Sequence, residues 1–552
     1  MYAYTTQDRE VIERRATQFR DQTTRYLNGE LSEEVFLPIR LQNGLYVQRH
    51  APMLRIAIPY GMVSSAQLQQ LASIADTYDR GYLHVTTRQN VQLNWLKLAD
   101  VPNILDELAM VNLHAIQTSG NCIRNTTTDA YAGIARDEDV DPRPICELIR
   151  QWSTLHPEFA FLPRKFKIAV NGATEDRAAI RFHDIGIQLR QREGDIQFQL
   201  YVGGGLGRTP VVGQAVFDWL PIEALLTYLD AILRVYNLNG RRDNKYKARI
   251  KILVKALGVD AFQEEVSRQI ELQSFDFHSI CKTKIGEISQ RFSSPSYVGG
   301  LDELELAQTL KDTGLRNKRF AHWLTTNVVG HKRPGYRAVT ISLKSKNNAP
   351  GDITSDQLRL VAELATQFSF SEARMTHQQN IVLADVNGFS LEALFNQLDA
   401  AGLATPNIKT ANDITCCPGG DFCALANAKS IPVANQIQDL FDDTDYLYDI
   451  GELKINISGC MNACGHHHIG DIGILGVDKK GREFYQVSLG GAAASKKATI
   501  GKILGPSFSE EEIPLVVQKL IDIYLAKRAD GESFYELYHR VGHSAFKEAV
   551  YA

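Results

Sequence analysis

The chain has 552 residues, of which 44% are hydrophobic and 22% are charged, a composition typical of folded globular proteins. That length accommodates about three or four domains, each large enough to bury its own core. The net charge of −4 gives no reason to expect a nucleic-acid partner. No hydrophobic run approaches the ~20 residues that a membrane-spanning helix needs, so we expect no membrane association either.

The N-terminal stretch, residues 1–48, is charged and patterned like a helix, without the hydrophobic centre of a signal peptide. We therefore expect a helical arm at this end of the chain. Eight cysteines in so long a chain do not form a disulfide framework. We expect a cytoplasmic protein whose thiols serve metal chemistry.

The chain contains an internal duplication. Residues 61–113 match residues 351–403 without a gap, at an offset of 290 positions. Further blocks match at an offset of 287, in the same order: FKIAVNG (166–172) with LKINISG (453–459), HDIGI (183–187) with GDIGI (470–474), and FQLYVGG (198–204) with YQVSLGG (485–491). Three blocks in one order are not a chance match.

Each copy begins with the same predicted elements. Residues 64–78 have helical periodicity, residues 82–96 (YLHVTTRQNVQLNWL) alternate like a strand, and residues 101–113 are helical again. A β-rich stretch follows in each copy. This order predicts an α+β fold in which two half-domains are related by a pseudo-twofold axis, with a cleft between them.

Basic residues gather in the first copy. Lys165 and Lys167 lie two positions apart on a predicted strand, so both side chains would project from one face. Arg55 lies within an otherwise apolar strand, and Arg124 follows in the TSGNCIRN segment. A charge inside a hydrophobic run is rarely buried without a partner. These four residues predict a pocket for a small polyanion, although two solvated lysines on an exposed strand are the alternative.

A second cationic stretch covers residues 239–255. It could bind a polycarboxylate cofactor or an acidic protein partner, or it could be the solvated face of an amphipathic helix that buries Ile250, Leu253 and Val254. We expect a mixture of these. The glycine-rich segment 202–210 (VGGGLGRTP) lacks the spacing of a dinucleotide-binding loop, and its repeat at 489–495 favours a backbone turn.

Four cysteines near the end of the chain form two pairs: Cys417 and Cys423 in a Cys-x5-Cys motif, Cys460 and Cys464 in a Cys-x3-Cys motif. A cubane iron–sulfur cluster needs four thiolates, one for each iron. If the chain after Gly459 is helical, Cys460 and Cys464 point to one side. A structural zinc usually has cysteines two to four residues apart, which fits the first pair poorly.

A set of buried free cysteines is the remaining alternative for these four residues. We interpret the other four, Cys122, Cys146, Cys281 and Cys416, as packing residues. We do not expect the histidines of 466–468 to bind metal, since four thiolates are already present.

The two copies differ where the chemistry is expected. At the offset of 287, Cys460 corresponds to Ala173 and Cys464 to Arg177, so the first copy cannot hold the same cluster. Conversely, Lys165 corresponds to Glu452. One copy keeps the metal ligands and the other keeps the basic site. A duplicated scaffold would build a single asymmetric active site in this way.

Together these motifs resemble the siroheme- and iron–sulfur-dependent sulfite and nitrite reductases, over nearly the whole chain and most closely the hemoprotein subunit of sulfite reductase. The resemblance implies siroheme coupled to a [4Fe-4S] cluster and paired ferredoxin-like half-domains. It implies the following division: an N-terminal helical arm (1–48), ferredoxin-like half-domain 1 (49–118), a siroheme and substrate-anion domain (119–275), a connecting segment (276–333), ferredoxin-like half-domain 2 (334–405) and a [4Fe-4S]/siroheme domain (406–552).

The resemblance also implies roles for individual residues. Cys417, Cys423, Cys460 and Cys464 would ligate the cluster, and Cys464 would bridge to the siroheme iron. Arg55, Arg124, Lys165 and Lys167 would line the substrate pocket. The matches to cofactor contacts are Thr86, Thr87, Arg88, Gln92 and Asn462. Two residues depart from the family: Met461 stands where many relatives have proline, and Asn94 where relatives carry histidine or arginine.

The implied activity is assimilatory reduction of sulfite to sulfide by six electrons, which supports cysteine synthesis. Lys167 favours sulfite, because a dianion gains more from a second ammonium than nitrite does. A siroheme nitrite reductase is the alternative, and a zinc-stabilised, non-enzymatic scaffold is a remote one. The sequence shows no flavin or NADPH domain, so we expect a separate flavoprotein subunit or a ferredoxin to deliver the electrons.

Overall fold

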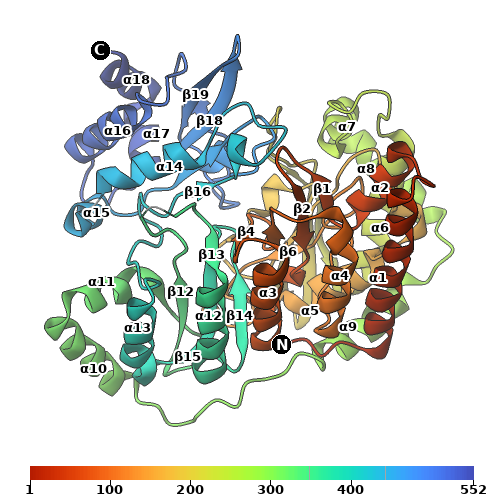
Figure 1. Ribbon diagram of the computed structural model, residues 1–552, viewed down its shortest axis with the longest axis horizontal. Helices are drawn as coiled ribbons and strands as arrows, with labels where there is room; N and C mark the ends of the chain where they lie inside the picture. Colours follow the sequence, from red (N-terminus) through yellow and green to blue (C-terminus); the bar gives the residue numbers. More distant parts are fainter. Residues whose placement is uncertain (347, 442) are drawn as a thin grey trace.

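The computed structural model describes residues 1–346, 348–441 and 443–552. Within these residues the strands form four five-stranded sheets, around which the helices pack (Figure 1). The expected α+β class and the internal duplication are both confirmed. None of the described helices combines the length and the hydrophobicity needed to cross a membrane.

The chain begins with two helices, α1 (Thr6–Leu27) and α2 (Glu33–Gln42). Thr5 and Asp8 cap α1 reciprocally, because each side chain bonds the other residue's backbone N–H. Phe19 and Phe36 stack with their ring centroids 5.9 Å apart and belong to a hydrophobic core that both copies share. The helical prediction for this region is confirmed, although its last residues form the short strand β1.

The first two sheets exchange strands between the two copies. One sheet has the order β1 (Leu45–Val47), β2 (Pro52–Ile56), β5 (Val91–Leu93), β4 (Tyr82–Val85) and β13 (Asp352–Thr354). The other has the order β11 (Val328–Gly330), β12 (Tyr336–Ile341), β15 (Ile381–Asn387), β14 (Glu372–Met375) and β3 (Met62–Ser64). Each copy therefore donates one short antiparallel strand to the sheet of the other.

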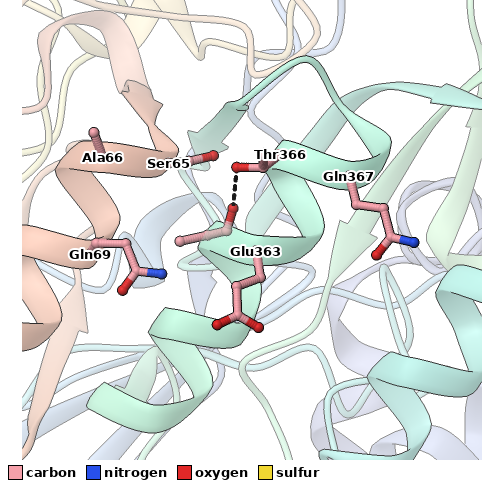
Figure 2. A pocket seen from close by; sticks show the side chains of 7 residues that line it. Ser65, Ala66, Gln69, Glu363, Thr366 and Gln367 are labelled. Atoms are coloured by element: carbon pink, nitrogen blue, oxygen red, sulfur yellow. Dashed lines mark hydrogen bonds between the residues drawn. The ribbon is translucent and has the colours of Figure 1, made fainter.

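Helices cover these sheets in matching positions: α3 (Ser65–Tyr78) and α4 (Val101–Met110) in the first copy, α12 (Ser355–Phe368) and α13 (Leu391–Ala400) in the second. α3 and α12 lie side by side at the centre of the molecule (Figure 1). Figure 2 shows the groove of about 460 Å³ between them, lined by residues such as Gln69, Glu363 and Gln367. No predicted site residue lines this groove.

The other two sheets also repeat one another. The first is β10 (Gln214–Pro221), β9 (Asp195–Val202), β8 (Ile185–Arg192), β7 (Ile168–Asn171) and β6 (Thr127–Thr128). The second is β16 (Thr415–Cys416), β17 (Ile455–Ser458), β18 (Ile472–Lys479), β19 (Arg482–Leu489) and β20 (Lys502–Ile503). β6 to β9 and β16 to β19 pair identically: two parallel contacts, then an antiparallel one.

Each of these two sheets, with the helices that pack on it, is called a lobe below. The remaining helices pack on the two lobes or connect the two copies. In the first part of the chain they are α5 (Arg143–Ser153), α6 (Leu225–Asn239), α7 (Ile250–Leu257), α8 (Val259–Glu271), α9 (Phe277–Ser289), α10 (Glu303–Arg316) and α11 (Lys318–Asn327). In the second part they are α14 (Ile431–Gln438), α15 (Thr444–Ile450), α16 (Ile513–Lys527), α17 (Phe534–Val541) and α18 (His543–Tyr551).

Two equivalent glutamines connect the sheets. Gln89 Nε2 donates to the carbonyl of Met375 at 3.1 Å, and Gln379 Nε2 donates to the carbonyl of Val85 at 3.2 Å. The carbonyl oxygen of each side chain accepts from the lobe of its own copy, Gln89 from Thr128 N and Gln379 from Cys416 N. Each glutamine thus joins both half-domains to one lobe.

One predicted strand is wrong. Residues 82–96 do not form a single strand, because a tight turn at Thr86–Asn90 separates β4 from β5. Gln89 has a φ of 56°, and the Thr86 hydroxyl accepts from the backbone N–H of Arg88 and Asn90, which closes the turn. Thr86, Thr87 and Arg88 therefore lie at a hairpin tip, which lets them reach the lobes.

Candidate functional site

The four cysteines of the two motifs lie on two loops that are hydrogen-bonded to one another. Cys417 directly follows β16, and Cys460 is the second residue after β17, following Gly459. The backbone N–H of Gly459 lies 3.2 Å from Cys417 Sγ, and Asn427 N donates to the Gly459 carbonyl at 2.8 Å. The parallel strands thus bring the Cys-x5-Cys and Cys-x3-Cys segments to one end of their sheet.

The chain after Gly459 is not helical, in contrast to the conditional expectation above. Residues 460–465 form consecutive turns, and Ala463 has a φ of 55°. Cys464 is exposed while Cys460 is buried. The turns, rather than a helical repeat, decide where these two thiols point.

Glycine is required where these loops pack. A Cβ atom on Gly465 would lie 1.9 Å from the carbonyl oxygen of Ile457, and one on Gly459 would lie 2.6 Å from that of Ala428. Such contacts cannot be relieved without moving the backbone. The two loops are therefore packed as closely as their backbones allow.

The four thiols share one electrostatic environment. Burial, together with the nearby Cys464, raises the pKa of Cys417 to about 12. Burial also raises the pKa of Cys460, again with contributions from Cys464 and Cys423. No three His, Cys, Asp or Glu side chains in the described residues are placed to hold a single metal ion.

This donor set fits a cubane cluster. Such a cluster takes one thiolate on each of four irons, so its ligands are spread around it. The irons also supply the positive charge that buried thiolates need. Four thiols on two tightly packed, glycine-rich loops meet both requirements.

Lys165 and Lys167 lie beside these loops. They flank Phe166 just before β7, which begins at Ile168, so neither lysine lies on the strand as predicted. Burial lowers the pKa of Lys167 well below its usual value, and the Arg88 and Lys165 charges lower it further. Burial also lowers the pKa of Lys165, with Cys464 acting in the opposite direction. These lysines are not solvated surface residues.

Arg88 reaches the same region from the hairpin tip. Its guanidinium donates to the carbonyl of Asn125 at 2.6 Å and to His183 Nε2 at 2.5 Å. Because His183 Nδ1 donates to the Ala179 carbonyl, this imidazole is neutral and accepts from the arginine. Burial and the charge of Arg124 lower the pKa of Arg88 to about 9.

Arg55 and Arg124 complete the basic cluster. Arg55 on β2 donates to Gln92 Oε1 at 3.3 Å, lies 5.6 Å from the centre of the Tyr46 ring, and has a buried Nε without a partner. Arg124 donates to the carbonyls of Thr118 and Gly120 at 2.6–3.0 Å. These hydrogen bonds go to neutral oxygens, which leaves the charge of both arginines available for an anion.

Sequence reasoning did not assign two residues that position this cluster, Asp184 and Arg249. Asp184 is fully buried and accepts from Arg249 at 2.6 Å and from the Lys167 backbone N–H at 2.9 Å. Asp184 stands in the HDIGI block, where an acidic residue beside a buried strand was the available signal. In the second copy Asp471 bonds Lys454 N equivalently, but burial raises its pKa to about 6.

The cationic stretch 239–255 divides into two parts. Arg249 and Lys251 point inward, and Lys251 Nζ donates to the carbonyls of Leu206 and Thr209 in the glycine-rich turn. The other basic residues of the stretch are exposed. Only α7 (Ile250–Leu257) is helical there; it buries Ile250 and Val254. The expected mixture of roles is thus observed, with a shorter helix.

The two halves meet around Cys464. Thr87 Oγ1 donates to the Cys464 carbonyl at 2.8 Å, and His377 Nδ1 donates to the Thr87 carbonyl at 3.2 Å. The glycine-rich turn lies against residues 461–462, and His468 bonds the Gly207 carbonyl at 3.0 Å. Asn462 is exposed beside this turn.

The candidate residues therefore lie close together in the fold. Its elements bring four thiols and five cationic side chains to the junction of the two lobes and the hairpin tip. The charge of Cys464 influences both sets, since it raises the pKa of Cys417 as well as that of Lys165. The junction can hold an anionic ligand next to a metal centre.

Comparison with known proteins gives matches over most of the chain. The family model described as the nitrite and sulphite reductase 4Fe-4S domain matches residues 119–273 and 408–552. The model described as the nitrite/sulfite reductase ferredoxin-like half domain matches residues 46–111 and 330–401. The half-domains expected to be ferredoxin-like are confirmed as such.

Individual relatives share about a quarter of their residues with this chain. The chain is 26% identical over 492 residues to sulfite reductase [ferredoxin] 1 of Mycolicibacterium paratuberculosis, covering 87% of this chain and 81% of that protein. It is 28% identical over 514 residues to the chloroplastic ferredoxin–nitrite reductase of Arabidopsis thaliana, covering 90% and 81%. The solved structure of the NirA protein of Mycobacterium tuberculosis matches with a TM-score of 0.74 and 25% identity, covering 92% and 90%.

Proposed function

The chain belongs to the nitrite and sulphite reductase family, and on this premise we propose that it is the catalytic subunit of an assimilatory sulfite reductase. One sulfite, six electrons and eight protons give one hydrogen sulfide and three waters. The observation that carries the proposal is the half-buried basic cluster beside Cys464, whose arginines donate to neutral oxygens. Such a pocket suits a compact dianion.

The cofactors of this family are siroheme and a [4Fe-4S] cluster, and the residues present fit both. When bound, these groups supply the electrons and the iron at which the substrate is reduced. We propose Cys417, Cys423, Cys460 and Cys464 as the cluster ligands. For the carboxylates of siroheme we propose Arg88 with Thr86, Thr87, Gln92 and Asn462. Buried carboxylates need nearby positive charge, which this lobe supplies.

We assign the chemistry of the substrate pocket to Arg55, Arg124, Lys165 and Lys167. The two guanidinium groups bind sulfite oxygens through N–H donors, and the two ammonium groups offset the dianion's charge. Each S–O cleavage needs a proton on the departing oxygen. A lysine with a lowered pKa is a stronger acid than ordinary lysine, so Lys165 Nζ and Lys167 Nζ are suited to deliver it.

Reduction of nitrite is the second candidate. It is favoured by the relative from Arabidopsis thaliana, named a nitrite reductase, which is as similar to this chain as the relatives named sulfite reductases. Lys167 favours sulfite, because a second ammonium stabilises a dianion more than a monoanion.

The test is turnover with reduced methyl viologen as the donor, comparing kcat/KM for sulfite and nitrite on one iron- and siroheme-loaded preparation. We expect a clear preference for sulfite. A preference for nitrite would overturn the substrate while leaving the cofactors in place. A colourless protein with stoichiometric zinc would instead support a non-enzymatic scaffold.

A ferredoxin is the proposed electron donor. Several relatives carry ferredoxin in their names, whereas a flavoprotein subunit has no such support.

The division into an arm, two half-domains, two lobes and a connecting segment follows the boundaries given above and is part of the proposal. So is a cytoplasmic location, which keeps the thiols reduced for metal binding.

A further inference from the structure

The contact between α3 and α12 has two ends, which the internal duplication makes equivalent. At the offset of 290, Ser65 corresponds to Ser355 and Thr366 corresponds to Asp76. At one end, Ser355 at the start of α12 bonds Asp76 near the end of α3. At the other end, Ser65 at the start of α3 faces Thr366 near the end of α12 (Figure 2). One arrangement therefore occurs twice, with different side chains.

A carboxylate of the chain itself occupies the first end. Asp76 accepts hydrogen bonds from Ser355 Oγ and from the guanidinium of Arg359. These two hydrogen bonds hold the pKa of Asp76 below its ordinary value. The dipole of α12 also favours a negative charge at the first turn of the helix. The start of α12 is thus an internal carboxylate site.

The second end has the same donor but not the carboxylate. Thr366 stands in place of Asp76, and its hydroxyl donates to the Ala362 carbonyl at 3.0 Å within α12 (Figure 2). Ser65 is only 9% exposed, and its buried Oγ has no hydrogen-bond partner in the described part of the chain. A buried hydroxyl without a partner is unfavourable. The groove of about 460 Å³ opens at this end, so a ligand that enters it can supply the acceptor.

The rest of the groove indicates what else the ligand carries. Among the described residues that line it, Glu363 alone is charged. Glu363 lies three residues before Thr366 on α12, so the two side chains are neighbours on one helix face, about 5–6 Å apart. The methyl groups of Ala66 and Ala362 provide an apolar surface in the same groove. These features suit a ligand with a carboxylate for the start of α3, an ammonium group for Glu363 and an aliphatic body.

We propose that this groove binds a free α-amino acid with an aliphatic side chain, whose carboxylate accepts from Ser65 Oγ and whose ammonium group bonds Glu363. Its side chain lies against the methyl groups of Ala66 and Ala362. The ligand joins one helix from each copy, as Asp76 does at the equivalent end. The site goes beyond the proposed function, because none of the residues proposed for sulfite or for the cofactors lines the groove.

The experiment titrates the iron- and siroheme-loaded enzyme by calorimetry with three matched probes. These are L-leucine, isocaproate, which lacks the ammonium group, and isoamylamine, which lacks the carboxylate. We expect L-leucine to bind with a Kd of about 1 mM or tighter and to raise the Tm of the enzyme. Isocaproate and isoamylamine should each bind at least about tenfold more weakly, because each loses one charged hydrogen bond.

Two variants test the carboxylate end of the groove. Ser65→Ala removes a hydroxyl that makes no hydrogen bond in the ligand-free protein, so the fold should be kept while L-leucine binds at least about tenfold more weakly. The double variant Thr366→Asp with Gln69→Arg reproduces the side chains of the occupied end, since Gln69 corresponds to Arg359. It should raise the Tm of the ligand-free enzyme and abolish binding of L-leucine.

A third variant tests the ammonium end. Glu363→Gln should weaken binding of L-leucine about tenfold and leave the affinity for isocaproate unchanged, because isocaproate has no ammonium group. The control is Glu264→Gln, which makes the same change at an exposed position on α8. This control should bind all three probes as the native enzyme does.

The proposal is overturned by a native enzyme that does not bind L-leucine at about 10 mM. Equal affinities of the native enzyme and Ser65→Ala would also overturn it, whether or not the double variant folds. Isocaproate that binds as tightly as L-leucine would refute an amino acid as the ligand. Because binding is measured without turnover, a failure to reduce sulfite would refute the proposed function and leave this test unaffected.

Discussion

Lys167 and Lys454 occupy equivalent positions in the two copies, yet their environments differ. The backbone N–H of each donates to an equivalent aspartate, Asp184 or Asp471, at 2.9 Å. Lys454 is exposed, whereas Lys167 lies among Arg88, Lys165 and Arg249. The backbone geometry is shared by both copies, so the neighbouring side chains alone distinguish the two lysines.

This equivalence provides a matched pair of variants for the substrate pocket. Lys167→Asn removes one ammonium from the pocket but leaves the backbone bond to Asp184 intact. We expect kcat/KM with reduced viologen to fall at least about tenfold for sulfite and only about twofold to threefold for nitrite. Lys454→Asn should change neither value. An equal loss for both anions would remove the argument that Lys167 selects the dianion.

The lowered pKa values of the two pocket lysines make substrate binding depend on pH. Burial and neighbouring cations disfavour both ammonium groups, so each deprotonates below its ordinary 10.5. A neutral amine no longer attracts the dianion. We therefore expect KM for sulfite to rise with pH in a range below that of exposed lysine, with KM measured from pH 7 upward.

The variant Lys165→Arg tests this cause, because arginine stays charged throughout that range. Its KM should rise less steeply with pH, whereas Lys454→Arg should follow the native profile. The lowered pKa values of these lysines also make the stability of the ligand-free protein depend on pH: stability should increase with pH, whereas substrate binding should weaken. Because the folded pKa lies below the unfolded one, the buried ammonium destabilises the ligand-free fold at low pH, and this penalty disappears as pH rises toward 10.5. A native KM for sulfite that does not depend on pH would contradict the expected role of the two lysines in substrate binding.

At the scale of the element, the cysteine loops depend on strand ends and glycines rather than on helices. β16 and β17 are parallel neighbours, so the segments that follow them leave the sheet at the same end. Gly465 lies where the Cys-x3-Cys loop returns against Ile457 and Cys417. A side chain at this position would separate the two loops that hold the thiols.

Gly465→Ala should therefore reduce cluster binding. Its Cβ would lie 1.9 Å from the Ile457 carbonyl oxygen, so the loop must move. We expect roughly 2–4 kcal/mol of lost unfolding free energy and a clear drop in iron and acid-labile sulfide per chain. Gly286→Ala in α9 is the control, because a Cβ there meets nothing within 4 Å and alanine favours the helix. Full iron occupancy in Gly465→Ala would contradict this role.

The sequence predicts these elements unevenly. Helical periodicity correctly predicts α3, and the repeated blocks correctly predict that the two lobes share one topology. The hairpin tip at Thr86–Asn90 is missed because its residues alternate like a strand, while the positive φ of Gln89 is invisible in the pattern. The turns of residues 460–465 are missed for the same reason, since cysteine spacing fits a helix equally well.

At the candidate site, the residues that stand in motifs could be identified from the sequence, whereas the residues that position them could not. The thiols and Lys165 stand in recognisable patterns. Arg249 could not be separated from six other basic residues in 239–255, because only the buried Asp184, just before β8, distinguishes it. The exchanged strands have no local signal either, because they depend on contacts between segments hundreds of residues apart.

At the scale of the whole molecule, the exchanged strands make the two copies one folding unit. β3 completes the sheet of the second copy, and β13 completes that of the first. The backbone N–H groups of Ser65 and Ser355 bond the carbonyls of Ser371 and Gly81, respectively, which repeats the exchange at both helix starts. Neither half can bury its central sheet without the other.

The equivalent glutamines test whether this symmetry extends to function. Gln89→Leu leaves Met375 O and Thr128 N without their partner, and Gln379→Leu leaves Val85 O and Cys416 N. Each buried unpaired group costs about 1–3 kcal/mol, so both variants should lose roughly 2–5 kcal/mol of unfolding free energy in urea. Because Cys416 adjoins Cys417, only Gln379→Leu should also lower the iron content. Equal iron loss in both variants would mean that the cluster depends on the whole interlocked fold and not on the bond that Gln379 makes.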